Sequence, residues 1–423
     1  MMESEADRAD ERLASLAVVL PLAMAGFVIA AGCWTLFAVV GVHLRSELNL
    51  SNFQFGFLLA MPMAVSAALA IPAGLAAQKF GARRVMLICL AGLAACMVIL
   101  LTTDTFPGYL VAAGGLGLAG GFYSAGLQFV TSHCESSRLG LVLGVFGAGV
   151  TGAGFNYYLV PLFHQAFSWH GVPLAYLIVL LLVLALLLIL TDPEDAAADP
   201  AAETSVRVLL RQMKHRRAWQ LCAYFGVVAG SFFALALWLP DYLSAQFALP
   251  VDYGARLAQW FVIPGALAQI AGGGLSDRYG SARVVSRALV VCLVALFLLS
   301  YPPMTLFIQG VDATIRVEYA LPMQAEGLLV VILGLAMGCA MGSLQRLVIV
   351  ENRPVAAFVA GLLLVSACSV AFVLPVIFSS VNHWLGIRSA VFMILFLLLT
   401  GCLFLFSRES RRHERESFLH PGI

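Results

Sequence analysis

The chain has 423 residues, of which 61% are hydrophobic and only 11% are charged. A soluble protein needs about a quarter of its residues charged, so this composition predicts a surface that faces lipid. The formal net charge of +1 leaves no excess of cations to replace the counterions of DNA or RNA, and we expect no nucleic-acid partner. The nine cysteines form no C-x-x-C pair, so neither disulfides nor a metal site is expected.

Long apolar runs follow one another along the whole chain. A membrane-spanning helix needs about 20 mostly apolar residues, and about twelve runs meet this requirement. Because the runs are continuous rather than alternating, they favour helices over a barrel. The chain is therefore predicted to be an all-α polytopic membrane protein, with spans near 16–42, 52–77, 83–103, 107–132, 139–163, 172–191, 217–240, 254–276, 284–303, 326–348, 354–380 and 387–407.

An internal repeat divides the chain. Residues 67–85 read AALAIPAGLAAQKFGARRV, and residues 266–284 read ALAQIAGGGLSDRYGSARV. In both copies an apolar run ends at a short charged turn with glycine, which indicates two related halves. We expect six-helix halves at 1–191 and 217–407, a cytoplasmic connector at 192–216 and a charged, disordered tail at 408–423. The second part of the connector, VRVLLRQMKHRRAW, is predicted to form a basic amphipathic helix.

The cations give the expected orientation. If the N-terminus is cytoplasmic, 20 of the 24 Lys and Arg residues fall on the cytoplasmic side, and only Arg45, Arg256, Arg316 and Arg388 fall outside. This asymmetry predicts that both termini are cytoplasmic. The expected location is a bacterial inner membrane or a membrane derived from it, with the lipid bilayer as a partner.

The turn of the second repeat, Gly273 to Gly280, contains Asp277 and Arg278, whereas the first copy has Gln78 at the acidic position. This turn and the six-plus-six arrangement resemble the major facilitator superfamily. The resemblance implies a conformational latch, in which a carboxylate meets a helix N-terminus or an arginine of the other half. The alternative is a positively charged turn closed by glycine. The predicted latch residues are Gln78, Lys79, Arg84, Asp277, Arg278 and Arg283.

Several motifs, in their order along the chain, are more specific: Cys33-Trp34-Thr35-Leu36-Phe37 in span 1, Gly120-Gly121-Phe122 in span 4, Gly144-Val145-Phe146-Gly147-Ala148-Gly149 in span 5 and Leu237-Trp238-Leu239-Pro240 in span 7. They resemble the nitrate/nitrite porter family within that superfamily. The resemblance implies one substrate-binding arginine in span 2 and one in span 8. This chain has Ala70 and Gln269 there, so a nitrate site of the family's kind is not supported at these positions.

Polar and aromatic residues inside the spans are the candidates for a substrate path. For each amide the alternative is a hydrogen bond between helices, and for each aromatic residue it is core packing. Gln269 is favoured because the resemblance places it where the family binds its ligand. The predicted path residues are Trp34, Phe37, Gln128, Thr151, Asn156, Trp238, Gln269, Gln345 and Arg346.

Two further patterns bear on mechanism. No Asp or Glu lies in the middle of a span, which favours uniport, exchange or coupling through the substrate, although Asp241 and Glu326 stand near span ends. At about 100° per residue, Gly144, Gly147 and Gly154 share one face of span 5, and Gly149 and Gly152 share another. These two faces predict close helix packing on two sides, or backbone that lines a path.

The expected function is transport of a small solute by alternating access, by a protein similar to nitrate/nitrite porters and most simply a monomer. One alternative is a divergent relative that moves iron or another small ion, as permeases of magnetosome membranes do. Another is a membrane receptor or scaffold that keeps the fold without transport. No nucleophile–base pair, metal motif or cofactor loop supports an enzyme, and no cofactor is expected.

Overall fold

The computed structural model describes residues 2–39, 44, 48–191, 216–309 and 314–419. Eleven helical segments of this part of the chain are long and apolar enough to cross a membrane. A twelfth helix, α11 (Val251–Tyr279), is equally long but contains Gln259, Gln269 and several glycines, which lower its hydropathy. The predicted all-α, twelve-helix architecture is confirmed. The amphipathic helix expected in the connector lies outside the described residues.

Seven helices among the described residues of the N-terminal half make six passes. They are α1 (Met2–Trp34), α3 (Asn52–Phe80), α4 (Ala82–Thr102), α5 (Phe106–Leu116), α6 (Leu118–Ser132), α7 (Leu139–Gly147) and α8 (Thr151–Leu190). Helices α5 and α6 form one pass interrupted at Gly117, and α7 continues into α8 through a short 3-10 turn at residues 148–150.

The 40-residue α8 serves two passes because it folds back on itself. The Tyr176 hydroxyl donates a hydrogen bond to Asn156, twenty residues earlier. At 1.5 Å per residue, a straight helix would hold these two residues about 30 Å apart. The chain therefore reverses between them, in a helix that contains Pro161 and Pro173. The predicted span 5 runs from α7 into the first part of α8, and the predicted span 6 lies in the last part of α8.

The C-terminal half contains α10 (Arg216–Gln246), α11, α12 (Ser281–Leu299), α13 (Met323–Glu351), α14 (Ala356–Leu385) and α15 (Ala390–Leu419). Between α12 and α13, strands β1 (Met304–Gln309) and β2 (Thr314–Tyr319) form an antiparallel hairpin in which Met304 pairs with Tyr319. This hairpin is not among the predicted elements. The expectation of a disordered tail from residue 408 is wrong up to Leu419, because α15 continues to that residue.

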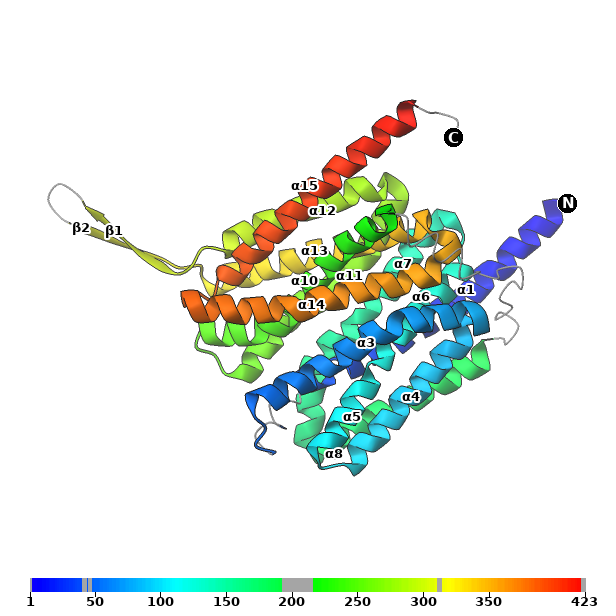
Figure 1. Ribbon diagram of the computed structural model, residues 1–423, viewed down its shortest axis with the longest axis horizontal. Coiled ribbons are helices and arrows are strands. Elements are labelled where there is room, and N and C mark those ends of the chain that lie inside the picture. Colours follow the sequence, from blue (N-terminus) through cyan, green and yellow to red (C-terminus); the bar gives the residue numbers. More distant parts are fainter. Residues whose placement is uncertain (1, 40–43, 45–47, 192–215, 310–313, 420–423) are drawn as a thin grey trace.

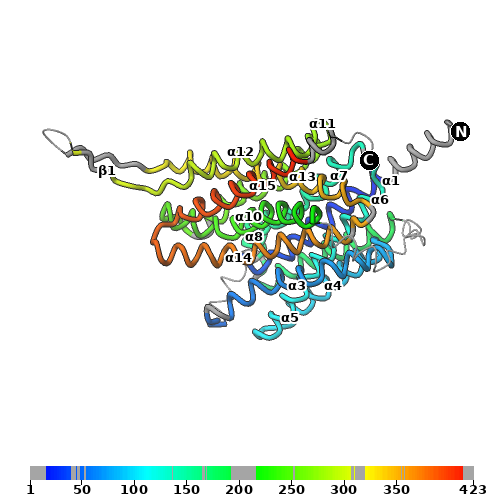
Figure 2. Tube along the Cα trace, turned by 45° about the horizontal axis from the view of Figure 1, so that its top comes forward, coloured from blue at the N-terminus to red at the C-terminus, as the bar shows by residue number. Residues whose placement is uncertain are grey.

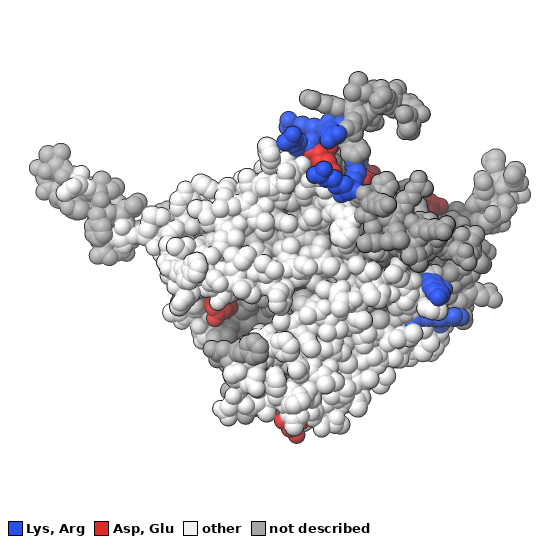
Figure 3. Space-filling model, viewed as in Figure 1, with Lys and Arg blue, Asp and Glu red and all other residues white. Residues whose placement is uncertain are grey.

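The helices lie roughly side by side and give the molecule two distinct ends. Figure 1 places the start of α1 and the end of α15 at one end, named here the terminal end, and the β1–β2 hairpin at the other, the hairpin end. Figure 2 shows the helices side by side from a second direction. Across the boundary between the halves, α3 packs on α14, and α7 packs on α11. Figure 3 shows a broad uncharged belt, with Lys and Arg gathered towards the terminal end.

The two repeat turns have the same backbone conformation. Gly81 between α3 and α4 has φ 91° and ψ 135°, and Gly280 between α11 and α12 has φ 87° and ψ 134°. A side chain is rarely tolerated at such φ values, so glycine permits both turns. The near-identity of the two conformations is the structural counterpart of the sequence repeat.

Candidate functional site

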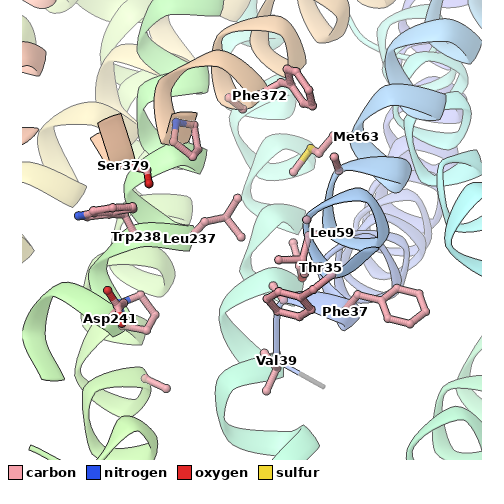
Figure 4. A pocket seen from close by; sticks show the side chains of 18 of the residues that line it. Thr35, Phe37, Val39, Leu59, Met63, Leu237, Trp238, Asp241, Phe372 and Ser379 are labelled. Carbon is pink, nitrogen blue, oxygen red and sulfur yellow. The ribbon is translucent and has the colours of Figure 1, made fainter. Parts of the chain in front are cut away.

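A cavity of about 1070 Å³ lies between the two halves at the hairpin end. Figure 4 shows Thr35, Leu59 and Met63 of the N-terminal half facing Leu237 of the C-terminal half across it, and Phe372 of the C-terminal half also lines the cavity. The side chains come from the end of α1 and residues 35–39 after it, from α8, from the first turns of α3 and α11, and from the matching ends of α10 and α14. The cavity is therefore bounded by both repeats, as a path between them requires.

The cavity wall is largely apolar and aromatic. Three residues of the predicted path, Trp34, Phe37 and Trp238, line it. The remaining wall includes Phe55, Phe57, Leu59, Met63, Leu237, Phe372, Pro375 and Val376. Of the described lining residues, only Asp241 on α10 and Arg256 on α11 are charged. A fully dehydrated ion would gain little from the apolar part of this wall, because burying a charge without a partner is costly.

Towards the terminal end the cavity closes on a packed floor. The Tyr157 hydroxyl donates to the Ala236 carbonyl at 3.1 Å, which joins α8 to α10. Deeper in the molecule, Phe27 stacks on Phe146 with ring centroids 5.1 Å apart, and Tyr123 lies against Phe27 at 5.2 Å. These three aromatic residues belong to the N-terminal half, and the Tyr157–Ala236 hydrogen bond is the contact of this floor that joins the two halves.

Two predicted path amides cross the boundary between the halves below the cavity. Gln269 on α11 donates from Nε2 to the Gly147 carbonyl at 3.1 Å, and Gln345 on α13 donates from Nε2 to the Tyr123 hydroxyl at 3.3 Å. Both glutamine side chains are buried. In this conformation the two glutamine side chains join the halves and do not line the cavity at the hairpin end.

Ala70 and Gln269, the positions at which the resemblance implies substrate-binding arginines, lie at tight helix contacts. Ala70 is fully buried, and a Cβ added to Gly361 of α14 would come within 2.7 Å of its carbonyl oxygen. A Cβ added to Gly144 of α7 would come within 2.4 Å of the Gln269 carbonyl oxygen. Ala70 thus lies where α3 packs closely on α14, and Gln269 lies where α11 packs closely on α7. These two helix pairs are equivalent under the pseudo-symmetry of the halves.

The predicted two-sided packing of span 5 is confirmed. Gly144 and Gly154 face α11, where an added Cβ on Gly154 would meet Ile263 at 2.6 Å. Gly149 and Gly152 face α1, where an added Cβ on Gly152 would meet the Val28 carbonyl oxygen at 1.8 Å. The glycines let this pass approach a helix of its own half on one side and a helix of the other half on the opposite side.

The remaining path candidates lie in helix contacts. Thr151 is buried at the start of α8, and Gln128 on α6 has a buried Oε1 atom without a hydrogen-bond partner among the described residues. The Asn156 amide donates to the Gly32 carbonyl at 2.6 Å and to the Thr35 hydroxyl at 2.9 Å, and accepts from Tyr176. Asn156 therefore ties three passes of the N-terminal half together.

Replacing Asn156 with alanine should lower the thermal stability of the protein. The change leaves the Gly32 carbonyl and the Tyr176 hydroxyl without their partner, and an unpaired buried polar group costs about 1–3 kcal/mol. Thermal unfolding of the purified protein in detergent checks this. Ser369→Ala is the matched control, because the exposed Ser369 hydroxyl bonds only to the Val365 carbonyl of its own helix. Equal melting temperatures for Asn156→Ala and Ser369→Ala would contradict the stabilising role of the Asn156 hydrogen bonds.

At the terminal end, Asp277 joins the two halves. Its Oδ1 accepts from the Gly140 backbone N–H at 2.9 Å, and its Oδ2 accepts from the Leu141 N–H at 2.8 Å. These are the unpaired donors at the start of α7, where the helix dipole favours a negative charge. Arg346 on α13 donates from Nε to Asp277 at 2.5 Å and from Nη1 to the Ser281 hydroxyl at 3.1 Å.

The other predicted latch residues do not reach Asp277. Lys79 lies over the Phe80 ring at 5.3 Å, and Arg278 lies over Tyr279 at 5.6 Å. Arg84 and Arg283 are exposed. The Gln78 Oε1 atom is buried without a hydrogen-bond partner among the described residues. The first copy of the repeat thus lacks the contact that Asp277 makes in the second.

Arg346 illustrates what the sequence reasoning missed. We predicted it in the substrate path, whereas the structure places its guanidinium on Asp277 at the terminal end. The signal was present, because an arginine at the end of an apolar run needs a partner, and Asp277 ends the neighbouring span at the same depth. A second unpredicted contact is Arg353, which donates to the Cys134 carbonyl at 2.7 Å and adds to the closure between the halves.

Two pseudo-symmetric helical halves, with a cavity open between them at one end and a polar closure at the other, define a membrane transporter. The model of the Major Facilitator Superfamily matches residues 22–375. The chain belongs to that superfamily.

Relatives within the superfamily are nitrate and nitrite transporters by name. The chain is 26% identical over 393 residues to a probable nitrate/nitrite antiporter, NarK1, of Thermus thermophilus, covering 90% of this chain and 88% of the relative. It is 25% identical over 281 residues to the nitrite extrusion protein of Bacillus subtilis, covering 66% and 69% of the two chains.

Solved structures show the same fold. The transporter FucP in its outward conformation matches with a TM-score of 0.71 at 15% identity, covering 93% of this chain and 99% of FucP. The human organic anion transporter MFSD10 matches with a TM-score of 0.68 at 17% identity, covering 92% and 99% of the two chains.

Proposed function

We propose that this transporter works by alternating access and that the structure corresponds to its outward-open state. The observation that carries the proposal is the pairing of an open cavity at the hairpin end with the Asp277 contacts at the terminal end. The concentration of Lys and Arg at the terminal end supports a cytoplasmic location for that end and for both termini. The membrane is then the bacterial inner membrane or one derived from it.

We propose nitrate or nitrite as the first substrates to test. The named functions of the relatives support this class of small anion, and Arg256 supplies a cation at the cavity. Without arginine at positions 70 and 269, the anion would keep part of its hydration shell and meet a single guanidinium. This mode of binding is weaker than a two-arginine clamp, since each charged hydrogen bond contributes about 1.5–3 kcal/mol.

A specific observation favours a second candidate, a neutral or largely apolar small solute. The aromatic wall of the cavity would suit such a molecule, and the missing arginines would then be of no consequence. By contrast, no group of three His, Cys, Asp or Glu side chains that could hold a metal ion occurs in the described parts of the chain. No observation on these residues therefore favours iron over the other two classes.

Uptake of nitrate and nitrite into vesicles containing the purified protein tests the proposal. Arg256→Gln should raise the half-saturating anion concentration about fivefold, because a partly screened charge near the path contributes about 1 kcal/mol. Asp241→Asn, which removes the opposite charge from the same cavity, should leave this concentration unchanged or lower it. Similar effects of both variants, or no uptake by folded protein, would count against an anion and direct the assay to neutral solutes.

A further inference from the structure

A basic pocket lies at the terminal end of the C-terminal half, away from the transport cavity. It has a volume of about 380 Å³ and lies between the first turns of α10 and the last described turns of α15. Arg216, Arg217 and Tyr224 come from α10, and Arg408, Glu409 and Arg412 come from α15. Figure 3 shows basic and acidic side chains gathered where α15 leaves the uncharged belt.

The acidic groups at this pocket are already engaged. Arg217 makes a two-pronged ion pair with Glu351 of α13, at 2.6 Å from Nε and 2.7 Å from Nη2. Glu409 accepts a hydrogen bond from the Tyr224 hydroxyl at 2.9 Å. Among the described residues, four arginines therefore face the two carboxylates of Glu409 and Glu351, which leaves an excess of positive charge.

One donor in the pocket is buried and unused. The Nη1 atom of Arg217 is screened from solvent and has no hydrogen-bond partner among the described residues. A buried guanidinium N–H without an acceptor is unfavourable, since the desolvation of the group is not offset. An anionic oxygen in the pocket would supply the missing acceptor.

The position of the pocket along α15 fits a membrane surface. Immediately before Arg408, Phe404 and Leu405 are 64% and 53% exposed, as expected for side chains in contact with lipid tails. Trp219, which follows the two arginines of α10, is 43% exposed, and tryptophan is typical of the membrane–water interface. The apolar, aromatic and cationic layers thus follow one another in the order of tails, interface and headgroups.

We propose that this pocket binds the headgroup phosphate of an anionic phospholipid. Guanidinium groups match the oxygens of a phosphate with paired hydrogen bonds, and basic pockets between membrane helices on the cytoplasmic side suit anionic headgroups. The bound lipid would join the ends of α10 and α15 and reinforce the Tyr224–Glu409 contact. Its acyl chains would lie along Phe404 and Leu405.

Thermal unfolding of the full-length protein in detergent, with lipid added, tests the proposal. Phosphatidylglycerol should raise the melting temperature of the wild-type protein, and phosphatidylcholine should not. The double variant Arg216→Gln/Arg408→Gln should lose at least fivefold in apparent affinity for phosphatidylglycerol. Arg216→Lys/Arg408→Lys, which keeps both charges but not the paired hydrogen bonds, should lose less affinity than the glutamine variant and shows that the pocket tolerates substitution.

The control variant is Arg84→Gln, which removes an exposed arginine from the terminal end of the other half. It should respond to phosphatidylglycerol like the wild-type protein. An undiminished response of the double variant to phosphatidylglycerol would overturn the proposal. Stabilisation of the wild-type protein by inorganic phosphate alone, to the same degree as by the lipid, would also overturn it and assign the pocket to a free phosphate.

Discussion

Replacing Asp277 with asparagine is expected to lower the transport rate strongly while leaving the amount of folded protein unchanged. Asparagine keeps one acceptor oxygen but loses the charge that attracts Arg346 and the start of α7. Hydrogen bonds to charged groups contribute about 1.5–3 kcal/mol, so closure of the terminal end should weaken roughly 10- to 150-fold. Transport should fall because the state with a closed terminal end becomes less populated relative to the state with an open terminal end. Uptake into vesicles, normalised to the protein present, measures the effect.

Cys134 provides a direct measure of the same shift. It is buried beside the closure, and burial raises the pKa of its thiol to about 11, so little of it is thiolate at neutral pH. Opening of the terminal end should expose Cys134, return its pKa towards the ordinary value and speed its reaction with a maleimide. Asp104→Asn, at an exposed turn of the hairpin end, is the control and should change neither the rate of uptake nor the rate of reaction of Cys134 with the maleimide. Unaltered uptake and labelling in Asp277→Asn would remove the latch role.

Replacing Gly273 with alanine is expected to produce a second large effect by a steric route. An added Cβ would come within 1.9 Å of the Gly140 carbonyl oxygen of α7, which is backbone and cannot rotate away. Relief requires α11 and α7 to separate, and overpacking of this kind costs about 1–3 kcal/mol. Because the contact joins the two halves, the cost falls on the closed terminal end. Cys134 labelling should rise and transport should fall.

The neighbouring glycine supplies a close control. At Gly274 the nearest atom to an added Cβ is Leu141 Cδ1, at the ordinary contact distance of 3.5 Å. Gly274→Ala should therefore transport and label like the wild-type protein, and the gain in helix propensity should keep its stability at or above the wild-type value. If the two alanine variants behave alike, the close approach of α7 and α11 has no part in closure.

The fold was largely predictable because its main determinants are local. Each membrane pass needs a long apolar run, and the glycine turns at Gly81 and Gly280 repeat in the sequence as they do in space. The β1–β2 hairpin was missed because its strands are short and lie in a connection that hydropathy treats as loop. The helical extension of α15 was missed because the charged composition of residues 408–419 suggested disorder, although Glu and Arg three to four residues apart also favour a helix.

The site was less predictable because it depends on which helices meet. The sequence marked Asp277 as a latch residue, but it could not show that its partners are two backbone N–H groups of α7 and the side chain of Arg346. Likewise, Gln269 and Asn156 are amides inside spans, and only the packing shows that they join helices in this state. The outer cavity draws on five or more segments far apart in sequence, so its aromatic wall could be predicted only in part, from Trp34, Phe37 and Trp238.

In the closure at Asp277, the charged side chains come from one half of the protein. Both members of the ion pair, Asp277 and Arg346, belong to the C-terminal half, whereas the N-terminal half contributes only two neutral N–H groups. When the halves part, the carboxylate keeps its counterion and exchanges two backbone donors for water. Separation of the halves at this contact therefore does not pull opposite charges apart, and salt at the terminal end should have little influence on how readily the contact opens.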